Sequence, residues 1–402
     1  MQLSIENIVK FFFCFLIFLL AECCGYNMIM MEGGYLDVGL GRYVIALTFM
    51  LWGGAVAIFM LPGVNFYKPP FTVTAFLAYF FWVIIPTTIL TTRSGDSLTF
   101  NIIGAWMPLL VLLLSYNIAR NYGHNRWFLI MFLAIGAICT RQYFKIFFNF
   151  NAIAEESHLI SSYYLLYILP LMMLCKSKTL RLTLSLLVLI MILISFKRAG
   201  IVALVLGLIT YVVSMQFVTN RIKPSSILAG LIIGALFAFV IIMLGNMGEE
   251  TLFERFENIG NDNGSGRTVV WAITAKMIED SDLSSLLFGH GYNAVVQNSP
   301  INLSAHNDFL EITYDYGIIG ITLYLSAFIS LCYYVVKMLR EKSEYAPSMA
   351  MLTSIMFVLS MISHIAIYYW MNVVMLTVGY CIGNFKRNKY LLIPQETNAL
   401  NE

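Results

Sequence analysis

Charged residues are scarce in this sequence: Asp, Glu, Lys and Arg make up 11% of its 402 residues, and 59% belong to the hydrophobic set. A soluble domain carries roughly 25% charged residues and about 45–50% apolar ones, so the composition excludes an ordinary soluble domain, and likewise a disordered chain. The net charge of +2 gives no indication of a nucleic-acid partner, and we expect none. The composition is typical of a polytopic membrane protein.

Several common site signatures are also missing. The seven cysteines are scattered through apolar runs without zinc spacing, which excludes a disulfide framework and favours a packing role. No Walker, Rossmann or Gly-x-Ser-x-Gly pattern occurs, and no DxD-like acidic pair, so we expect neither a cofactor nor a metal. Glu22 stands directly before Cys23 and does not suit a signal-peptide cleavage site, so we expect an uncleaved first span.

Long apolar runs are abundant. A membrane helix needs about 20 mainly apolar residues, and the runs predict an all-α fold with about twelve transmembrane helices. The runs lie at 8–24, 43–61, 71–91, 100–118, 127–143, 159–175, 180–196, 199–218, 226–245 and 317–337, with a last stretch at 348–384. That stretch is too long for one span, and we divide it near His364–Tyr368.

The predicted organisation has four parts. Transmembrane helices one to nine occupy 1–245, an outer loop with short amphipathic helices occupies 246–316, helices ten to twelve occupy 317–384, and 385–402 form a cytoplasmic tail. With the N-terminus inside, fifteen of the 24 basic residues fall on the cytoplasmic side and seventeen of the 22 acidic residues fall outside. We therefore expect both termini in the cytoplasm and the long loop, whose length is typical of functional loops, outside.

Basic residues on the outer face run against this charge bias. Lys197 and Arg198 (SFKRAG) lie between the seventh and eighth spans, and Arg198 opens a helix whose free N–H groups already favour an anion. A phosphate at the lipid surface fits such a cationic helix start, because guanidinium holds phosphate oxygens in a bidentate fork. Snorkelling to headgroups is the simpler explanation, and for this pair alone it is favoured.

The long loop contains another arginine at the start of a predicted helix. The turn NGSG precedes a helix in which Val270, Ile273, Met277 and Ile278 share one face, and we expect that face to lie on the bilayer surface. Arg267 stands in its first turn, where a carboxylate would be usual. Salt bridging to the acids of the loop is the alternative, and it is favoured more clearly for Arg255 (FERFEN), which has glutamates on both sides.

A histidine follows in HNDFLEITYDYGIIG. His306 precedes a predicted short helix that leads through Gly317 into span ten. At the outer face of a membrane a histidine can accept a proton near neutral pH, as a general base must. A hydrogen-bonded surface histidine is the ordinary interpretation, and His290 is equally available. Tyr292, Asn307 and Tyr314 are the type of residue that binds sugars, although such residues are common in any polar loop.

These residues together resemble a known family. The His306-Asn307 motif followed by Gly317-Ile318-Ile319-Gly320 is similar to the motif of the O-antigen ligase and O-antigen polymerase superfamily. SFKRAG resembles the arginine that this family has at the outer end of a span, and GSGRTVVW resembles its arginine in a periplasmic-loop helix. The order of the three elements is the same, and the likeness covers roughly residues 190–325.

The resemblance implies a membrane glycosyltransferase of the GT-C type, inverting and metal-independent, in the bacterial inner membrane with a periplasmic active site. Donor and acceptor would be oligosaccharides on undecaprenyl pyrophosphate, and membrane lipids and a chain-length regulator are further candidate partners. His306 would be the catalytic base, and Arg198 and Arg267 would bind the pyrophosphate. Arg255 and Lys197 are weaker candidates for the same cluster.

Three functions remain open. An O-antigen polymerase joins repeat units that are both lipid-linked, whereas an O-antigen ligase transfers the glycan to lipid A-core; the motif does not separate them, and general size and aromatic richness favour the polymerase. A lipid-linked oligosaccharide flippase or other transporter is the alternative from a different class, but transporters tend to have repeated halves and charges at the midplane.

Overall fold

The computed structural model describes residues 5–31, 38–60, 67–90, 96–150, 161–195, 198–219, 267–363 and 370–392. Within these ranges every regular element is a helix, which confirms the all-α fold class. The helices are α1 (Ile5–Met31), α2 (Val38–Phe59), α3 (Phe71–Ile89), α4 (Asp96–Tyr122), α5 (Arg126–Phe150), α6 (Ser162–Met172), α7 (Lys178–Ile194), α8 (Arg198–Thr219), α11 (Arg267–Glu279), α12 (Leu283–Phe288), α13 (Ala294–Asn298), α14 (Asp308–Arg340), α15 (Ala346–Ile362) and α16 (Met371–Leu392).

Seven of these helices are long and apolar enough to cross a membrane. They are α1 to α5, α8 and α14, and α6 and α15 are shorter apolar helices. The expected span nine at 226–245 lies outside the described residues, so the count of twelve stays a prediction. The stretch 348–384 is divided as expected, with one helix ending at Ile362 and the next beginning at Met371, while His364–Tyr368 lies outside the described residues. The protein is a multi-pass membrane protein.

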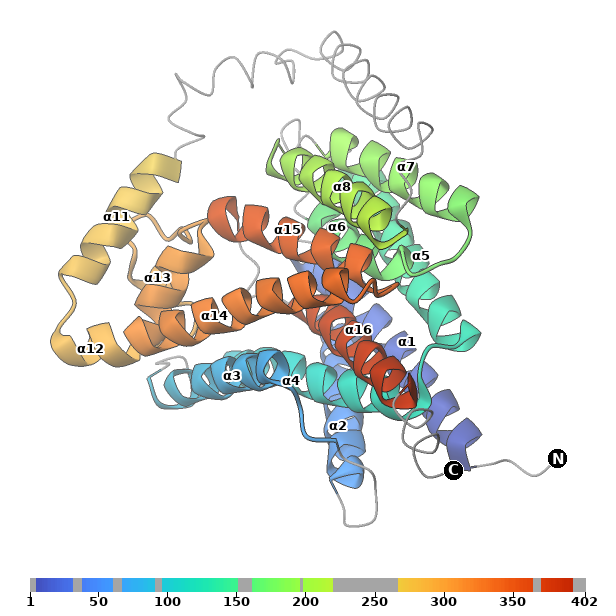
Figure 1. Ribbon diagram of the computed structural model, residues 1–402. Coiled ribbons are helices and arrows are strands. Elements are labelled where there is room, and N and C mark those ends of the chain that lie inside the picture. Colours follow the sequence, from blue (N-terminus) through green and yellow to red (C-terminus); the bar gives the residue numbers. More distant parts are fainter. Residues whose placement is uncertain are drawn as a thin grey trace, which may run out of the picture.

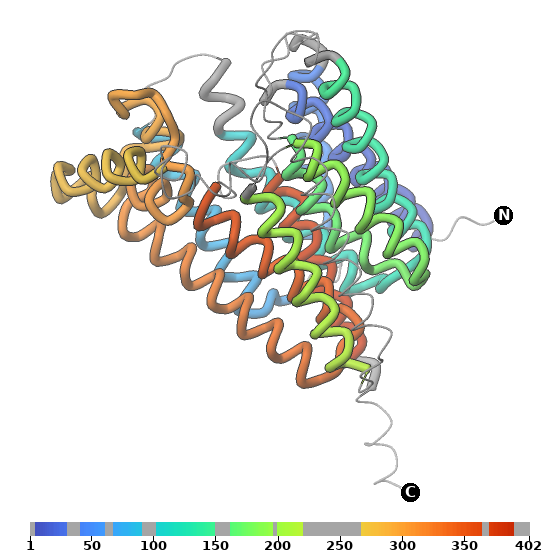
Figure 2. Tube along the Cα trace, turned by 90° about the horizontal axis from the view of Figure 1, so that it is seen from above, coloured from blue at the N-terminus to red at the C-terminus, as the bar shows by residue number. Residues whose placement is uncertain are grey.

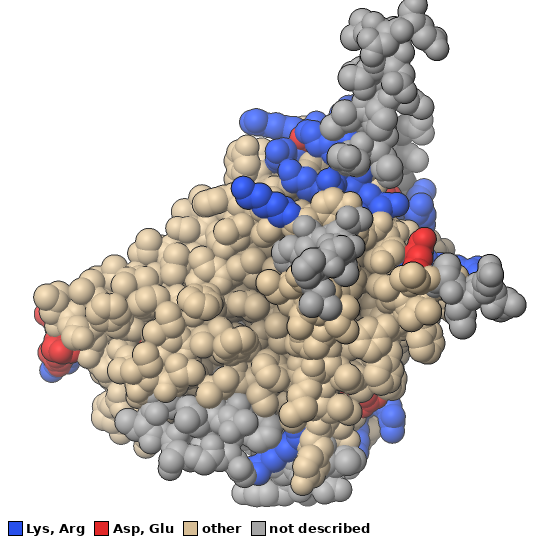
Figure 3. Space-filling model, turned by 90° about the horizontal axis from the view of Figure 1, so that it is seen from below, with Lys and Arg blue, Asp and Glu red and all other residues tan. Residues whose placement is uncertain are grey.

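The helices form a bundle whose two ends differ (Figure 1). The short helices α11, α12 and α13 lie together at one end, and the start of α1 and the end of α16 lie toward the other; the view from above agrees (Figure 2). Seen from below, most of the visible Lys and Arg side chains gather in the upper part of the picture, with a few acidic ones among them; further basic side chains lie at the lower edge, and acidic side chains with a basic one lie at the left end (Figure 3). The positive-inside rule favours the cytoplasm for the side on which most basic residues gather.

Close backbone packing joins the two halves of the chain. A Cβ atom at Gly379 would lie 2.1 Å from Ser115 Oγ, and one at Gly383 would lie 2.5 Å from the Tyr116 carbonyl oxygen. These glycines form a Gly-x-x-x-Gly stripe on α16, which lets α4 approach closely, as small residues do between membrane helices. The C-terminal helix is thereby fixed against the N-terminal half.

Candidate functional site

The site is built around the start of α14. Asn307 is the N-cap: its Oδ1 accepts hydrogen bonds from the backbone N–H groups of Phe309 (2.9 Å) and Leu310 (3.2 Å). Its Nδ2 donates to the carbonyl oxygen of Met361 at the end of α15 (3.1 Å). His306, directly before this cap, is half-buried and has φ of 51°, in the left-handed region. Asn307 therefore serves as a structural anchor that sets where His306 stands.

Asp308 strengthens the same anchor. Its Oδ2 accepts hydrogen bonds from Ser360 Oγ on α15 (2.8 Å) and from the hydroxyl of Tyr324 (3.4 Å), and the two hydroxyl oxygens are 2.8 Å apart. All three side chains are fully buried. A buried carboxylate needs such donors to offset its lost hydration. The first turn of α14 is thus fixed to α15 by side chains, so His306 is held on a rigid element.

Asp315 and Gly317 shape the next turn. Asp315, fully buried, accepts a hydrogen bond from the backbone N–H of Val295 (3.0 Å) and so holds the start of α13. Gly317 has φ of 72° and ψ of −176°, which breaks the helix, and the Trp82 Nε1 of α3 donates to the Tyr316 carbonyl oxygen beside the break (2.9 Å). A Cβ at Gly317 would lie 2.2 Å from the Leu287 carbonyl oxygen. The short helix leading through Gly317 into the span is therefore confirmed.

The two candidate histidines, His290 and His306, have different surroundings in the structure. The ring of His290 stacks on that of Tyr314, with centroids 4.0 Å and planes 11° apart, and its Nδ1 is 3.1 Å from the Tyr314 carbonyl oxygen. The hydroxyl of Tyr314 accepts a hydrogen bond from Asn298 Nδ2 (3.0 Å). His290 and Tyr314 therefore hold the α12–α13 segment onto α14, and His306 is the histidine at the helix start.

Tyr292 lies beside two acids of α14. Burial, together with the nearby carboxylates of Asp315 and Glu311, raises the pKa of its hydroxyl above the ordinary value. The phenol is therefore protonated at neutral pH, so its hydroxyl can donate a hydrogen bond. Its predicted glycan contact stays a prediction.

Arg267 opens α11, as expected, and α11 packs against α14. Val270 is buried, and Met277 and Ile278 pack against a small cluster that includes Ala294 and Tyr314. The apolar face that the sequence assigned to the bilayer surface is in this part covered by protein. The pattern of apolar residues predicts a buried face but does not tell protein from lipid.

Tyr163 on α6 connects the separate parts of the site. Its ring lies against Gly200, near the start of α8, where a Cβ would be 3.2 Å from Tyr163 Cε1. Its side chain lies near Ser363, directly after α15, and within electrostatic range of Arg267. The start of α8 and the guanidinium of Arg267 therefore share a neighbour at the end of α15. Sequence analysis did not single out Tyr163, because nothing in its apolar surroundings marks it.

The predicted site residues are thus brought to one end of the bundle, as far as they are described. The backbone of Arg198 begins α8, but its side chain lies outside the described part, as do Lys197 and Arg255. Asn307, directly after His306, is bonded to the end of α15, and Arg267 lies within electrostatic range of Tyr163. Among the described residues no group of three or more His, Cys, Asp or Glu side chains is placed to hold a metal ion.

A comparison with known families finds a match in this part of the chain. Residues 183–325 match the family model described as O-antigen ligase, a stretch that runs from α7 to the middle of α14. It contains Arg198, Arg267 and His306, the three elements on which the resemblance was based. No curated protein matches the chain.

Proposed function

Because residues 183–325 carry a domain of the O-antigen polymerase and ligase superfamily, we propose that the protein is an O-antigen polymerase of the bacterial inner membrane. It joins undecaprenyl-pyrophosphate-linked repeat units at the periplasmic face. Membership of this superfamily indicates a glycosyltransferase acting on lipid-linked glycans; the polymerase assignment, the carrier lipid and the location are the finer parts of the proposal.

The observation that carries the proposal is that three helix starts lie at one end of the bundle. The start of α14 is bonded to the end of α15, and Tyr163 contacts the start of α8 and lies within electrostatic range of Arg267 at the start of α11. Helix starts and arginines both favour a diphosphate. A base beside a diphosphate is the arrangement that glycosyl transfer requires.

The chemistry follows from these roles. His306 takes the proton of an acceptor sugar hydroxyl as the oxygen attacks the anomeric carbon of the donor. The bond between that carbon and the pyrophosphate oxygen breaks on the opposite face, so the anomeric configuration inverts. Arg198 and Arg267 stabilise the negative charge that develops on the leaving lipid pyrophosphate. No metal is needed in this scheme, because two guanidinium groups take the role of the cation.

Replacing the base tests the proposal. Because Asn tolerates the left-handed backbone found at position 306, His306→Asn keeps the local fold but cannot accept the proton. We expect chain elongation to fall by at least about 10²-fold, within the usual contribution of a general base. The measurement is the transfer rate of the purified protein with a synthetic lipid-linked repeat.

His124→Gln, a histidine outside this site, is the matched control and should keep its activity. Full activity of the His306→Asn variant would remove the base assignment. Glycan analysis of cells lacking the protein separates the functions: a single repeat on lipid A-core indicates a polymerase, unligated long chains a ligase, and repeats trapped on the cytoplasmic face a flippase.

A further inference from the structure

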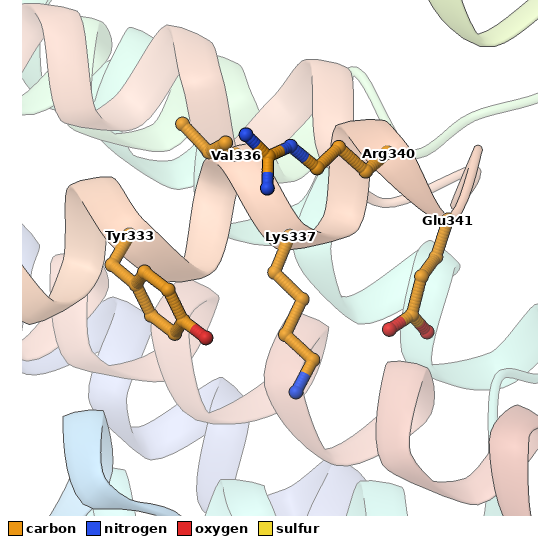
Figure 4. Close-up of a pocket in the computed structure, with 5 residues that line it drawn as sticks. All are labelled: Tyr333, Val336, Lys337, Arg340 and Glu341. Atoms are coloured by element: carbon orange, nitrogen blue, oxygen red, sulfur yellow. The ribbon is translucent and has the colours of Figure 1, made fainter.

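An open recess lies at the end of α14 that is away from His306. Its lining comprises Tyr333, Val336, Lys337, Arg340 and Glu341. Lys337 and Glu341 extend to the same side of the helix (Figure 4). A straight helix from Gly317 to Arg340 rises about 35 Å at 1.5 Å per residue. The recess is therefore separate from the candidate site at the start of α14.

One face of α14 is apolar and exposed along the span. Its members are Ile318, Leu325, Ile329, Tyr333 and Val336, each between 38% and 66% exposed. They follow one another at intervals of seven, four, four and three residues, which places them on one stripe of the helix. Tyr333 and Val336 also line the recess, so the stripe runs directly into it.

The hydroxyl groups on this side of α14 are satisfied within the helix. Thr322 Oγ1 donates a hydrogen bond to the Ile318 carbonyl oxygen (2.7 Å), and Ser326 Oγ donates to the Thr322 carbonyl oxygen (2.7 Å). Polar groups that face hydrocarbon must be satisfied internally, because lipid chains offer no partner. The stripe is therefore suited to contact with acyl chains.

Positive charge exceeds negative charge around the recess. Lys389 on α16 pairs with Glu341, its Nζ lying 3.1 Å from Glu341 Oε1. In the part of the chain that the structure describes, no carboxylate lies within ion-pair distance of Lys337 or Arg340. The three cations and the single carboxylate leave a net charge of +2, which one phosphodiester does not neutralise.

A further lysine adds to this excess. Lys386 on α16 is half-buried. Burial lowers the pKa of its ammonium group, and so do the positive charges of Lys337, Arg120 and Lys389, while Glu341 raises it. Like charges held at short range repel one another. An anion with more than one negative charge would reduce this repulsion.

We propose that the recess binds the headgroup of a phospholipid with two phosphodiester groups, the chemistry of cardiolipin, with an acyl chain along the α14 stripe. Two phosphodiesters supply the two negative charges that the recess lacks, and the stripe supplies an apolar surface that a free anion does not need. Basic pockets at the ends of membrane helices suit such headgroups. The bound headgroup contacts the ends of α14 and α16. The site does not depend on glycosyl transfer or on whether the protein is a polymerase.

The experiment measures binding to the purified full-length protein by native mass spectrometry and by the rise in Tm. Its probes are cardiolipin, phosphatidylglycerol with a single phosphate, and inorganic pyrophosphate, which has no acyl chain. We expect cardiolipin to bind more tightly and to raise the Tm more than either of the others. Lys337→Ala with Arg340→Ala should weaken cardiolipin binding roughly 30-fold, from about fivefold for each basic residue near an anionic lipid.

Two further variants make the test specific. Lys176→Ala with Lys178→Ala removes the same charge from exposed side chains beside the start of α7, and should bind cardiolipin as the parent protein does. Lys176 lines a pocket together with Glu344, which follows α14, so this control lies at the same end of the molecule. Glu341→Gln removes the negative charge of the recess and should tighten cardiolipin binding about fivefold. A gain in binding does not arise from misfolding, so this variant keeps the test valid if the first double variant does not fold.

Several results would overturn the proposal. Equal losses in the two double variants would show a general effect of surface charge, and unchanged binding after Lys337→Ala with Arg340→Ala would place the lipid elsewhere. Equal binding of phosphatidylglycerol would show that one phosphate suffices, and an equal rise in Tm with pyrophosphate would show a free-anion site. Unchanged binding after Glu341→Gln would show that the charge of the recess does not act on the lipid. A dimer that excludes cardiolipin would assign the stripe to a second copy of the chain.

Discussion

At the scale of single residues, the acids around His306 have structural roles. Asp308 accepts hydrogen bonds from Ser360 and Tyr324, and Asp315 accepts one from the backbone of Val295. Ser360 lies 52 residues from Asp308 along the chain, so no local sequence pattern predicts this contact. Asp308 and Asp315 therefore fix the short helix that follows His306.

The guanidinium of Arg267 gives a test at the scale of single residues. Arg267→Ala should lower the transfer rate about 10²- to 10³-fold, the usual cost of losing one donor that stabilises developing charge. Arg267→Lys should recover only part of the rate, because a point charge lacks the planar fork. Lys276→Ala, which removes a cation in the last turn of the same helix, is the control and should leave the rate unchanged. Full recovery with lysine would show that charge alone acts at this position.

At the scale of elements, the break at Gly317 decides how α12 meets α14. Position 317 has a positive φ and no room for a Cβ, because the Leu287 carbonyl oxygen is within 2.2 Å of where it would stand. Gly317→Ala therefore has to move α12 or the helix start, and a backbone with positive φ and ψ near 180°, which is nearly confined to glycine, alone costs an alanine about 1–3 kcal/mol. We expect faster proteolysis between α12 and α14 and loss of transfer, with membrane insertion kept.

Gly54→Ala is the matched control, because nothing lies within 4 Å of a Cβ added at that position in α2. Trp82→Phe removes the donor to the Tyr316 carbonyl oxygen and should give a weaker effect in the same direction, about 1 kcal/mol. If Gly317→Ala resists proteolysis as well as Gly54→Ala does, the break is not needed to dock α12.

Sequence patterns predicted local breaks well and long-range contacts poorly. The helix start at Arg267, the short helix that leads through Gly317 and the division after Ile362 all depend on neighbouring residues, and each was predicted. The role of Tyr163 depends on residues from three other segments, so the chain around it carries no signal. The Gly379–Gly383 stripe was visible in the sequence but was not used, because its partner on α4 is known only from the fold.

At the scale of the whole molecule, the two ends must face opposite sides of the membrane if the proposed chemistry is periplasmic. Single cysteines test this. Ser284→Cys on α12 and Thr179→Cys on α7 replace exposed hydroxyl residues at the two ends. A membrane-impermeant maleimide should label the first in intact spheroplasts and the second only after lysis, because the basic end is retained in the cytoplasm. The parent chain, whose seven cysteines are buried or half-buried, gives the background. Labelling of Thr179→Cys in intact spheroplasts would place the basic end outside and contradict a periplasmic site at His306.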